Sequence, residues 1–125
     1  MKTNELTGAA LDWAVAKCEA QKSETSYVKT VAGKLFINSP LNPIGPLRNF
    51  CPSTDWAQGG LIIEQEKIGF NWVVSNYLHV TGCWSAHIPQ TNGKILYAPT
   101  PLIAAMRCYV ASKLGDEIDV PKELL

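Results

Sequence analysis

The sequence has no run of about 18 apolar residues, which is the length that a membrane-spanning helix requires. Its first residues, 1–6, also lack the apolar segment of a secretory signal peptide. Nor is there an excess of basic residues, because Lys and Arg together number 11, as do Asp and Glu. Proteins that bind nucleic acid through phosphate contacts usually carry such an excess. We therefore expect a chain that stays in the cytosol where it is made, with no membrane attachment and no nucleic-acid partner.

Closely spaced cysteines are missing as well. The chain has four cysteines, which lie more than 20 residues apart and form no Cys-x-x-Cys pair: Cys18, Cys51, Cys83 and Cys108. We interpret them as reduced, small apolar side chains. A chain of 125 residues is long enough to bury roughly two thirds of the surface that it exposes when unfolded. The sequence therefore predicts a single domain over residues 1–125 that needs no metal, disulfide or cofactor.

The clearest predicted element is a helix over residues 101–114. Thr100 can cap its first amides, Pro101 suits the first helical position, and Gly115 can take the left-handed conformation that ends a helix. Its apolar residues recur at helical spacing: Leu102, Ile103, Met106, Val110 and Leu114. This apolar stripe must be buried against another part of the chain.

Two further helices are predicted, over residues 5–20 and 54–66. Ser53 or Thr54 is expected to cap the second of them. The pair Gly59–Gly60 lies inside this helix, although a glycine there costs roughly 1 kcal/mol relative to alanine. Either another backbone passes within contact distance at this point, or the helix begins after the two glycines.

Residues 68–98 change to the alternating apolar pattern of β-strands. Tight turn signals such as Asn92–Gly93 indicate an antiparallel sheet. The helix over residues 101–114 is expected to cover the sheet face that is formed by Phe70, Trp72, Trp84 and Ile88. The prediction is an α+β fold, with a small antiparallel sheet packed against three helices. The alternative is a two-layer structure with the helices on one face of the sheet.

Residues 27–38 favour β-structure on both sides of Gly33, which can turn a hairpin. Residues 39–53 contain four prolines and are expected to lack regular structure. Irregular segments of this length are uncommon in compact domains unless they have a function.

Three stretches, which begin at Met1, Ser53 and Pro99, carry a resemblance to a known family. They read MKTNELTGAALDWAVAKC, STDWAQGG and PTPLIAAMRCYVASKLGDE. Together they resemble the NinX-like proteins of lambdoid bacteriophages and prophages. The resemblance implies a phage origin and expression in the cytoplasm of a bacterial host, and it brings no catalytic residues. A looser likeness to small phage α-β-α sandwich proteins implies helices on both sides of the sheet.

His79, Cys83 and His87 are spaced four residues apart and are candidate zinc ligands. A closed zinc site has four ligands, however, and Gly82 is expected to turn the chain between them. We therefore interpret them as sheet-surface histidines and a buried thiol, and we predict no metal. A nucleophilic Cys–His pair would need contact and an activated thiolate, which the sequence does not show.

Asp55 and Arg107 are the strongest candidates for a polar binding site. Arg107 lies among small residues beside the main apolar stripe, where an anion or a bidentate partner fits. The structural interpretation is that Asp55 belongs to a helix start and that Arg107 is solvated or salt-bridged. The segment from Ser53 to Gly60 lacks the spacing of a phosphate-binding loop.

The chain has four tryptophans, of which Trp56 is the candidate for exposure because it follows the proline-rich segment. Our first hypothesis is a non-catalytic phage accessory protein that binds a host or phage protein. Its candidate binding residues are Arg48, Asp55, Trp56, Gly59, Gly60 and Arg107. The alternative is a small-ligand-binding protein or enzyme with a pocket around Asp55 and Arg107. A homodimer is a third possibility.

Overall fold

The predicted α+β class is confirmed by the computed structural model. It describes residues 1–21, 27–31, 34–38, 48–75, 80–89 and 94–124. The helical elements are η1 (Thr3–Glu5), α1 (Gly8–Ala20), α2 (Trp56–Glu66), α3 (Pro101–Leu114) and η2 (Lys122–Leu124). The strands are β1 (Tyr27–Val31), β2 (Lys34–Asn38), β3 (Arg48–Asn49), β4 (Gly69–Ser75), β5 (Val80–His87) and β6 (Leu96–Ala98). No helix among these residues has the length and apolar character needed to cross a bilayer.

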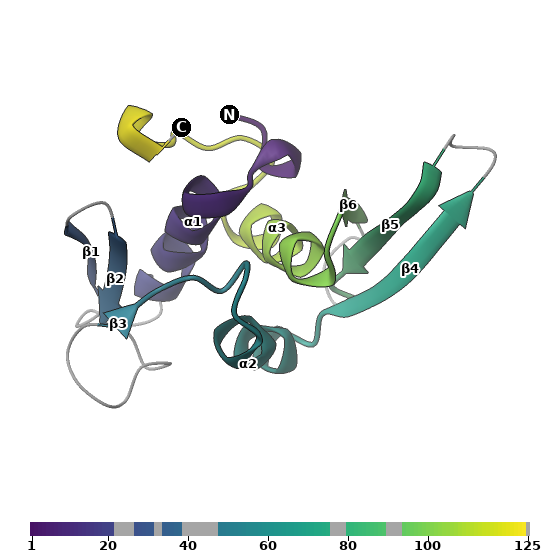
Figure 1. Ribbon diagram of the computed structural model, residues 1–125, viewed down its shortest axis with the longest axis horizontal. Coiled ribbons are helices and arrows are strands. Elements are labelled where there is room, and N and C mark those ends of the chain that lie inside the picture. The colour runs from purple at the N-terminus through teal and green to yellow at the C-terminus, as the bar shows by residue number, and fades with distance from the viewer. Residues whose placement is uncertain (22–26, 32–33, 39–47, 76–79, 90–93, 125) are drawn as a thin grey trace.

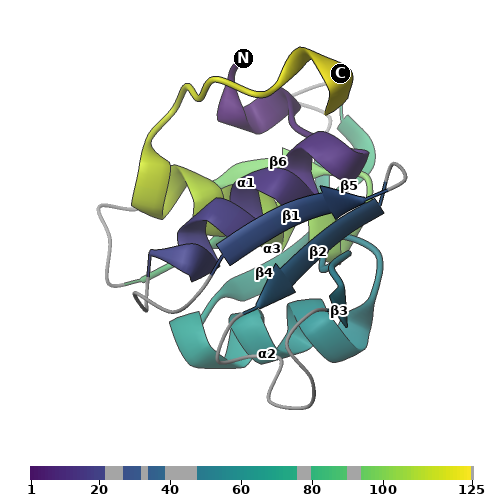
Figure 2. The same ribbon diagram turned by 90° about the vertical axis from the view of Figure 1, so that its left-hand side faces the viewer.

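The strands form two antiparallel sheets, ordered β1-β2-β3 and β4-β5-β6. The second is the predicted sheet over residues 68–98. The first contains the hairpin predicted over residues 27–38, with Val31 paired to Lys34. Helices α1 and α3 lie between the two sheets, as Figures 1 and 2 show. The described helices lie on one face of β4-β5-β6, and the sheet β1-β2-β3 lies on the far side of α1 and α3 (Figure 1).

Helix α3 is the centre of the core. Met106 and Val110 are fully buried, as the apolar stripe predicts. Tyr109 is also fully buried, because α1 packs on the side of α3 that faces away from β5. Its hydroxyl donates a hydrogen bond of 2.6 Å to Glu19 Oε1 on α1. Burial and the adjacent Glu19 raise the pKa of Tyr109, so its hydroxyl keeps its proton and acts as a donor.

Helix α1 begins at Gly8, three residues later than predicted, because the chain before it forms the short helix η1. Gly8 has a φ of 56°, which side chains rarely allow, so this glycine permits the turn into α1. Thr3 in η1 is buried, and its hydroxyl donates a 2.7 Å hydrogen bond to the Gly115 carbonyl at the end of α3. Lys2 and Glu117 form an antiparallel bridge, so the N-terminal segment lies beside the segment that follows α3 (Figure 1).

Candidate binding surface

The turn before α2 fixes the position of the first candidate residues. Asp55 caps the helix, because its Oδ1 accepts a 2.9 Å hydrogen bond from the Ala57 amide. The prediction that Ser53 or Thr54 is the cap was therefore wrong. Ser53 is buried instead, and its amide donates a 2.9 Å hydrogen bond to Asp12 Oδ1 on α1.

Gln58 braces this turn, a role that the sequence analysis missed. Its Oε1 accepts a hydrogen bond from the Cys51 amide, and its Nε2 donates to Asn49 O and to Asp55 Oδ2. The available signal was the spacing of Asp55 and Gln58, which matches a capping residue followed three positions later by Glu or Gln. Here the Gln side chain binds the amide of Cys51 and not that of the cap itself.

Gly59 and Gly60 both lie within α2, so the helix does not begin after them. A Cβ atom at Gly59 would come within 2.4 Å of the Pro52 carbonyl oxygen and 2.6 Å of Leu102 Cδ2. A Cβ at Gly60 would have no atom within 4 Å. The prediction of a close backbone approach is therefore confirmed at Gly59, where it lets α2 contact the preceding turn and α3.

Two ionisable groups near this turn have raised pKa values. Burial raises the pKa of Asp12, although the hydrogen bonds with Ser53 oppose this shift. Burial also raises the pKa of the Cys51 thiol, and the nearby charges of Asp12 and Asp55 add to the effect. Because the thiolate is the nucleophilic form, this shift disfavours nucleophilic chemistry at Cys51.

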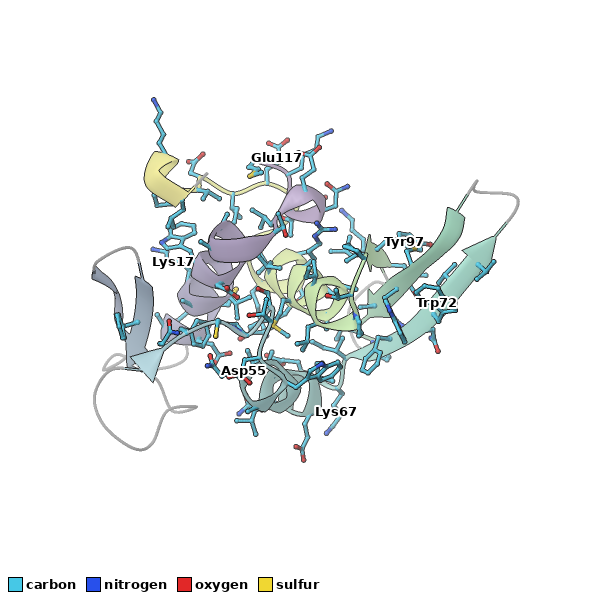
Figure 3. The ribbon with its side chains drawn as sticks, viewed as in Figure 1. Lys17, Asp55, Lys67, Trp72, Tyr97 and Glu117 are labelled. Carbon is cyan, nitrogen blue, oxygen red and sulfur yellow. The ribbon has the colours of Figure 1, made fainter. Side chains whose placement is uncertain are left out.

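Arg107 holds two other parts of the fold together. Its Nε donates a 2.7 Å hydrogen bond to Leu6 O after η1, and its Nη1 donates one of 2.7 Å to Tyr97 O on β6. Partial burial lowers the pKa of Arg107 but leaves it a cation. Within the described residues no hydrogen bond or ion pair joins Arg107 to Asp55, and Figure 3 shows Asp55 at the start of α2, away from Tyr97. The two side chains have separate structural partners.

The other candidate residues from the sequence are Arg48 and the three candidate zinc ligands. Arg48 lies in β3, which the sequence analysis assigned to the irregular segment, and its side chain is outside the described part of the structure. His79 is likewise outside the described residues. Cys83 and His87 lie on β5, and the His87 ring contacts Gly69 on β4. Among the described side chains, no three potential metal ligands come together.

Trp56 is 52% exposed, as the sequence analysis proposed for one of the tryptophans. It lies beside a groove of about 240 Å³ between the N-terminal ends of α2 and α3. We call this feature the Trp56 groove, and its lining residues are Ser53, Thr54, Trp56, Thr100, Pro101, Leu102 and Ile103. The groove is mostly apolar, and Trp56 is its largest side chain.

The Trp56 ring continues into a row of aromatic side chains along β4 and β5. The ring centroids are 6.1 Å apart for Trp56 and Phe70, 6.0 Å for Phe70 and Trp84, and 5.4 Å for Trp84 and Trp72. Phe70 and Trp84 pack against the core, as predicted. Trp72 does not and is 55% exposed, because the outer part of the β4–β5 hairpin projects beyond α3 (Figures 1 and 3). Its indole packs on Gly82 instead.

We expect Asp55→Ala to lower the free energy of unfolding by about 1 kcal/mol, because it removes the cap of α2. Asp55→Asn keeps an oxygen acceptor and should have a much smaller effect. Urea denaturation of both variants measures the difference. Equal destabilisation by the two substitutions would show that the carboxylate matters beyond capping, through its charge or through the Oδ2 atom that accepts a hydrogen bond from Gln58.

Taken together, these features describe a small α+β protein with an exposed apolar groove and an adjoining aromatic row. A family model described as "Bacteriophage P22, NinX" matches residues 2–113, and the chain therefore belongs to this family of phage proteins. Comparison with curated protein sequences gives no match.

Proposed function

We propose that this phage accessory protein acts by binding a host or phage protein through the Trp56 groove, and not by catalysis. The observation that carries the proposal is the exposure of Trp56 in a turn where the polar side chains of Asp55 and Gln58 have structural partners. Asp55 caps α2, and Gln58 braces the turn before it. Trp56 has no comparable reason to stay half in water. The bacterial cytoplasm is the proposed location, and neither a membrane nor nucleic acid is a proposed partner.

The groove has the properties of a protein-binding hot spot. Tryptophan gives a large contact area, and hot spots are enriched in it. The Phe70 ring, 6.1 Å away, supports Trp56 from one side, so less side-chain entropy is lost when a partner binds. Pro101 and Ile103 add apolar surface on the opposite helix end. A partner that inserts an aliphatic or proline side chain between Trp56 and Pro101 fits this surface.

The test is a pull-down from phage-infected cells with tagged protein as bait. We expect a specific host or phage protein to bind the wild type and to be lost with Trp56→Ala. Leu61→Ala is the matched control, because Leu61 is a 46% exposed apolar residue on the same helix outside the groove. With the purified partner, Trp56→Ala should weaken binding by at least about 30-fold, the effect of losing one hot-spot residue.

Arg48→Ala is a second arm of the same experiment, because Arg48 precedes the turn that leads to α2. If binding is lost with Arg48→Ala but not with Trp56→Ala, the contact surface lies near β3 and not at the Trp56 groove. Retention of the partner by Trp56→Ala would reject the Trp56 groove as the contact surface. Circular dichroism on each variant separates lost binding from lost folding.

A further inference from the structure

The sheet β4-β5-β6 has two edge strands, and they differ in how they are protected. Strand β6 has three residues, and its Tyr97 carbonyl accepts a hydrogen bond from Arg107. Strand β4 has seven residues, Gly69–Ser75, and within the described structure it pairs with β5 alone. Every second residue of such an edge directs its N–H and C=O groups away from the sheet. Figure 1 shows β4 along the outer border of the projecting hairpin.

Strand β4 also lacks the features that usually prevent edge pairing. Its sequence, GFNWVVS, has no charged residue and no proline. The hairpin does contain an irregularity between the pairs Val73–Cys83 and Ser75–Val80. Between these pairs β4 has one residue and β5 has two, so the extra residue lies on β5, where Gly82 has a φ of 152°. The bulge therefore bends the inner strand and leaves the edge strand regular.

We propose that β4 pairs antiparallel with β4 of a second copy of this chain, about a two-fold axis at Trp72. This register places Trp72 opposite its own copy and Phe70 opposite Val74 of the other chain. All three side chains lie on the same face of the strand, because they are two residues apart. Aromatic and β-branched side chains are favourable cross-strand neighbours in antiparallel sheets. Trp72 is 55% exposed and Val74 is 64% exposed in the single chain, and the pairing would cover both.

Charge is the reason to choose a second copy over an unrelated strand. Strand β4 carries no charged side chain, and in the register about Trp72 its apolar residues Phe70, Trp72 and Val74 meet one another. Self-pairing therefore brings no like charges together, and β4 has no charged group that would select a complementary foreign strand. Neither Trp72 nor Val74 lines the Trp56 groove, and of the residues in the proposed pairing only Phe70 contacts Trp56.

The test is the molar mass of the purified protein by sedimentation equilibrium over a wide concentration range. The 13.7 kDa chain should form a dimer at the upper end of the range. Trp72→Glu and Trp72→Lys each place two like charges at the two-fold axis. Each should weaken self-association at least about tenfold, because like charges directly opposite one another are destabilising. An equimolar mixture of the two variants should dimerise again, because opposite charges then meet at the axis.

Three outcomes would overturn the proposal: a wild type that stays monomeric throughout, single variants that dimerise as well as the wild type, or a mixture that fails to recover. A monomeric wild type would mean that the free edge of β4 pairs, if at all, with a strand of another protein. Leu61→Glu is the control for an added surface charge and should dimerise normally. If circular dichroism shows that the Trp72 variants are unfolded, Val74→Glu replaces them, and unchanged dimerisation of that variant would count against the pairing. The pull-down with Trp56→Ala tests the binding groove, and the molar mass tests the β4 pairing, so either proposal can fail without the other.

Discussion

Gly59→Ala should lower the free energy of unfolding by about 1–3 kcal/mol, whereas Gly60→Ala should raise it by about 0.5–1 kcal/mol. The two glycines are neighbours in α2, and alanine is the better helix former at both positions. The difference comes from their surroundings. The new methyl group at Gly59 would come within 2.4 Å of the Pro52 carbonyl oxygen, and this backbone atom cannot move without distorting the turn before α2. The methyl group at Gly60 enters open space.

Thermal and urea unfolding of both variants test this expectation. A change of 1 kcal/mol corresponds to a shift of several degrees in Tm for a domain of this size. Each variant serves as the control for the other, because both make the same change in the same helix. A stabilising effect of Gly59→Ala would show that α2 does not need its close contact with Pro52 and Leu102.

Arg107→Ala should lower the free energy of unfolding by about 2–3 kcal/mol, because two charge-assisted hydrogen bonds to main-chain carbonyls are lost. These bonds connect α3 to Leu6 and to Tyr97, which lie in different parts of the chain. Arg107→Lys should recover only part of the loss, because a single ammonium group cannot reproduce the geometry of Nε and Nη1. Urea denaturation of the three proteins gives the comparison.

Lys113→Ala is the matched control, because it also removes a cation from α3. Lys113 is exposed, and its 3.6 Å ion pair with Glu66 should contribute less than about 1 kcal/mol. If Arg107→Ala were as mild as Lys113→Ala, the two carbonyl contacts would not be important for stability. Arg107 would then be available to an anionic ligand, as the alternative hypothesis of a small-ligand pocket requires.

The sequence was most informative where the signals are local. The bounds of α3 follow from Thr100, Pro101 and Gly115, and the structure shows Thr100 Oγ1 accepting a hydrogen bond from the Ile103 amide. The hairpin of β1 and β2 and the alternating strands of the second sheet were also predictable, because strand periodicity is a property of short segments. The close approach at Gly59 was predictable for a related reason, since two glycines inside a helix are costly without packing.

The exposure and the partners of several side chains were not predictable, because they depend on how the helices and strands pack together. Trp72 alternates with polar residues in the same way as Phe70, yet it is exposed because α3 ends before the hairpin does. The role of Arg107 was not predictable, because its partners are main-chain carbonyls that carry no sequence signal. Strand β3 was missed for a similar reason, since its two residues form a strand only by pairing with β2. The exposure of Trp56 was predicted from the sequence, whereas Asp55 and Arg107 have separate structural partners.

The pairing of Lys2 with Glu117 has a consequence for the order in which the protein is made. Residues 1–6 are translated before their hydrogen-bond partners at Gly115, Asp116 and Ile118, which lie more than a hundred residues later in the sequence. Helix α1 must also wait for α3, against which it packs. Because contacts so distant in sequence form late, we expect native structure to appear only once the helix over residues 101–114 has emerged from the exit tunnel. Ribosome-bound chains stalled before this helix should therefore remain sensitive to protease along α1.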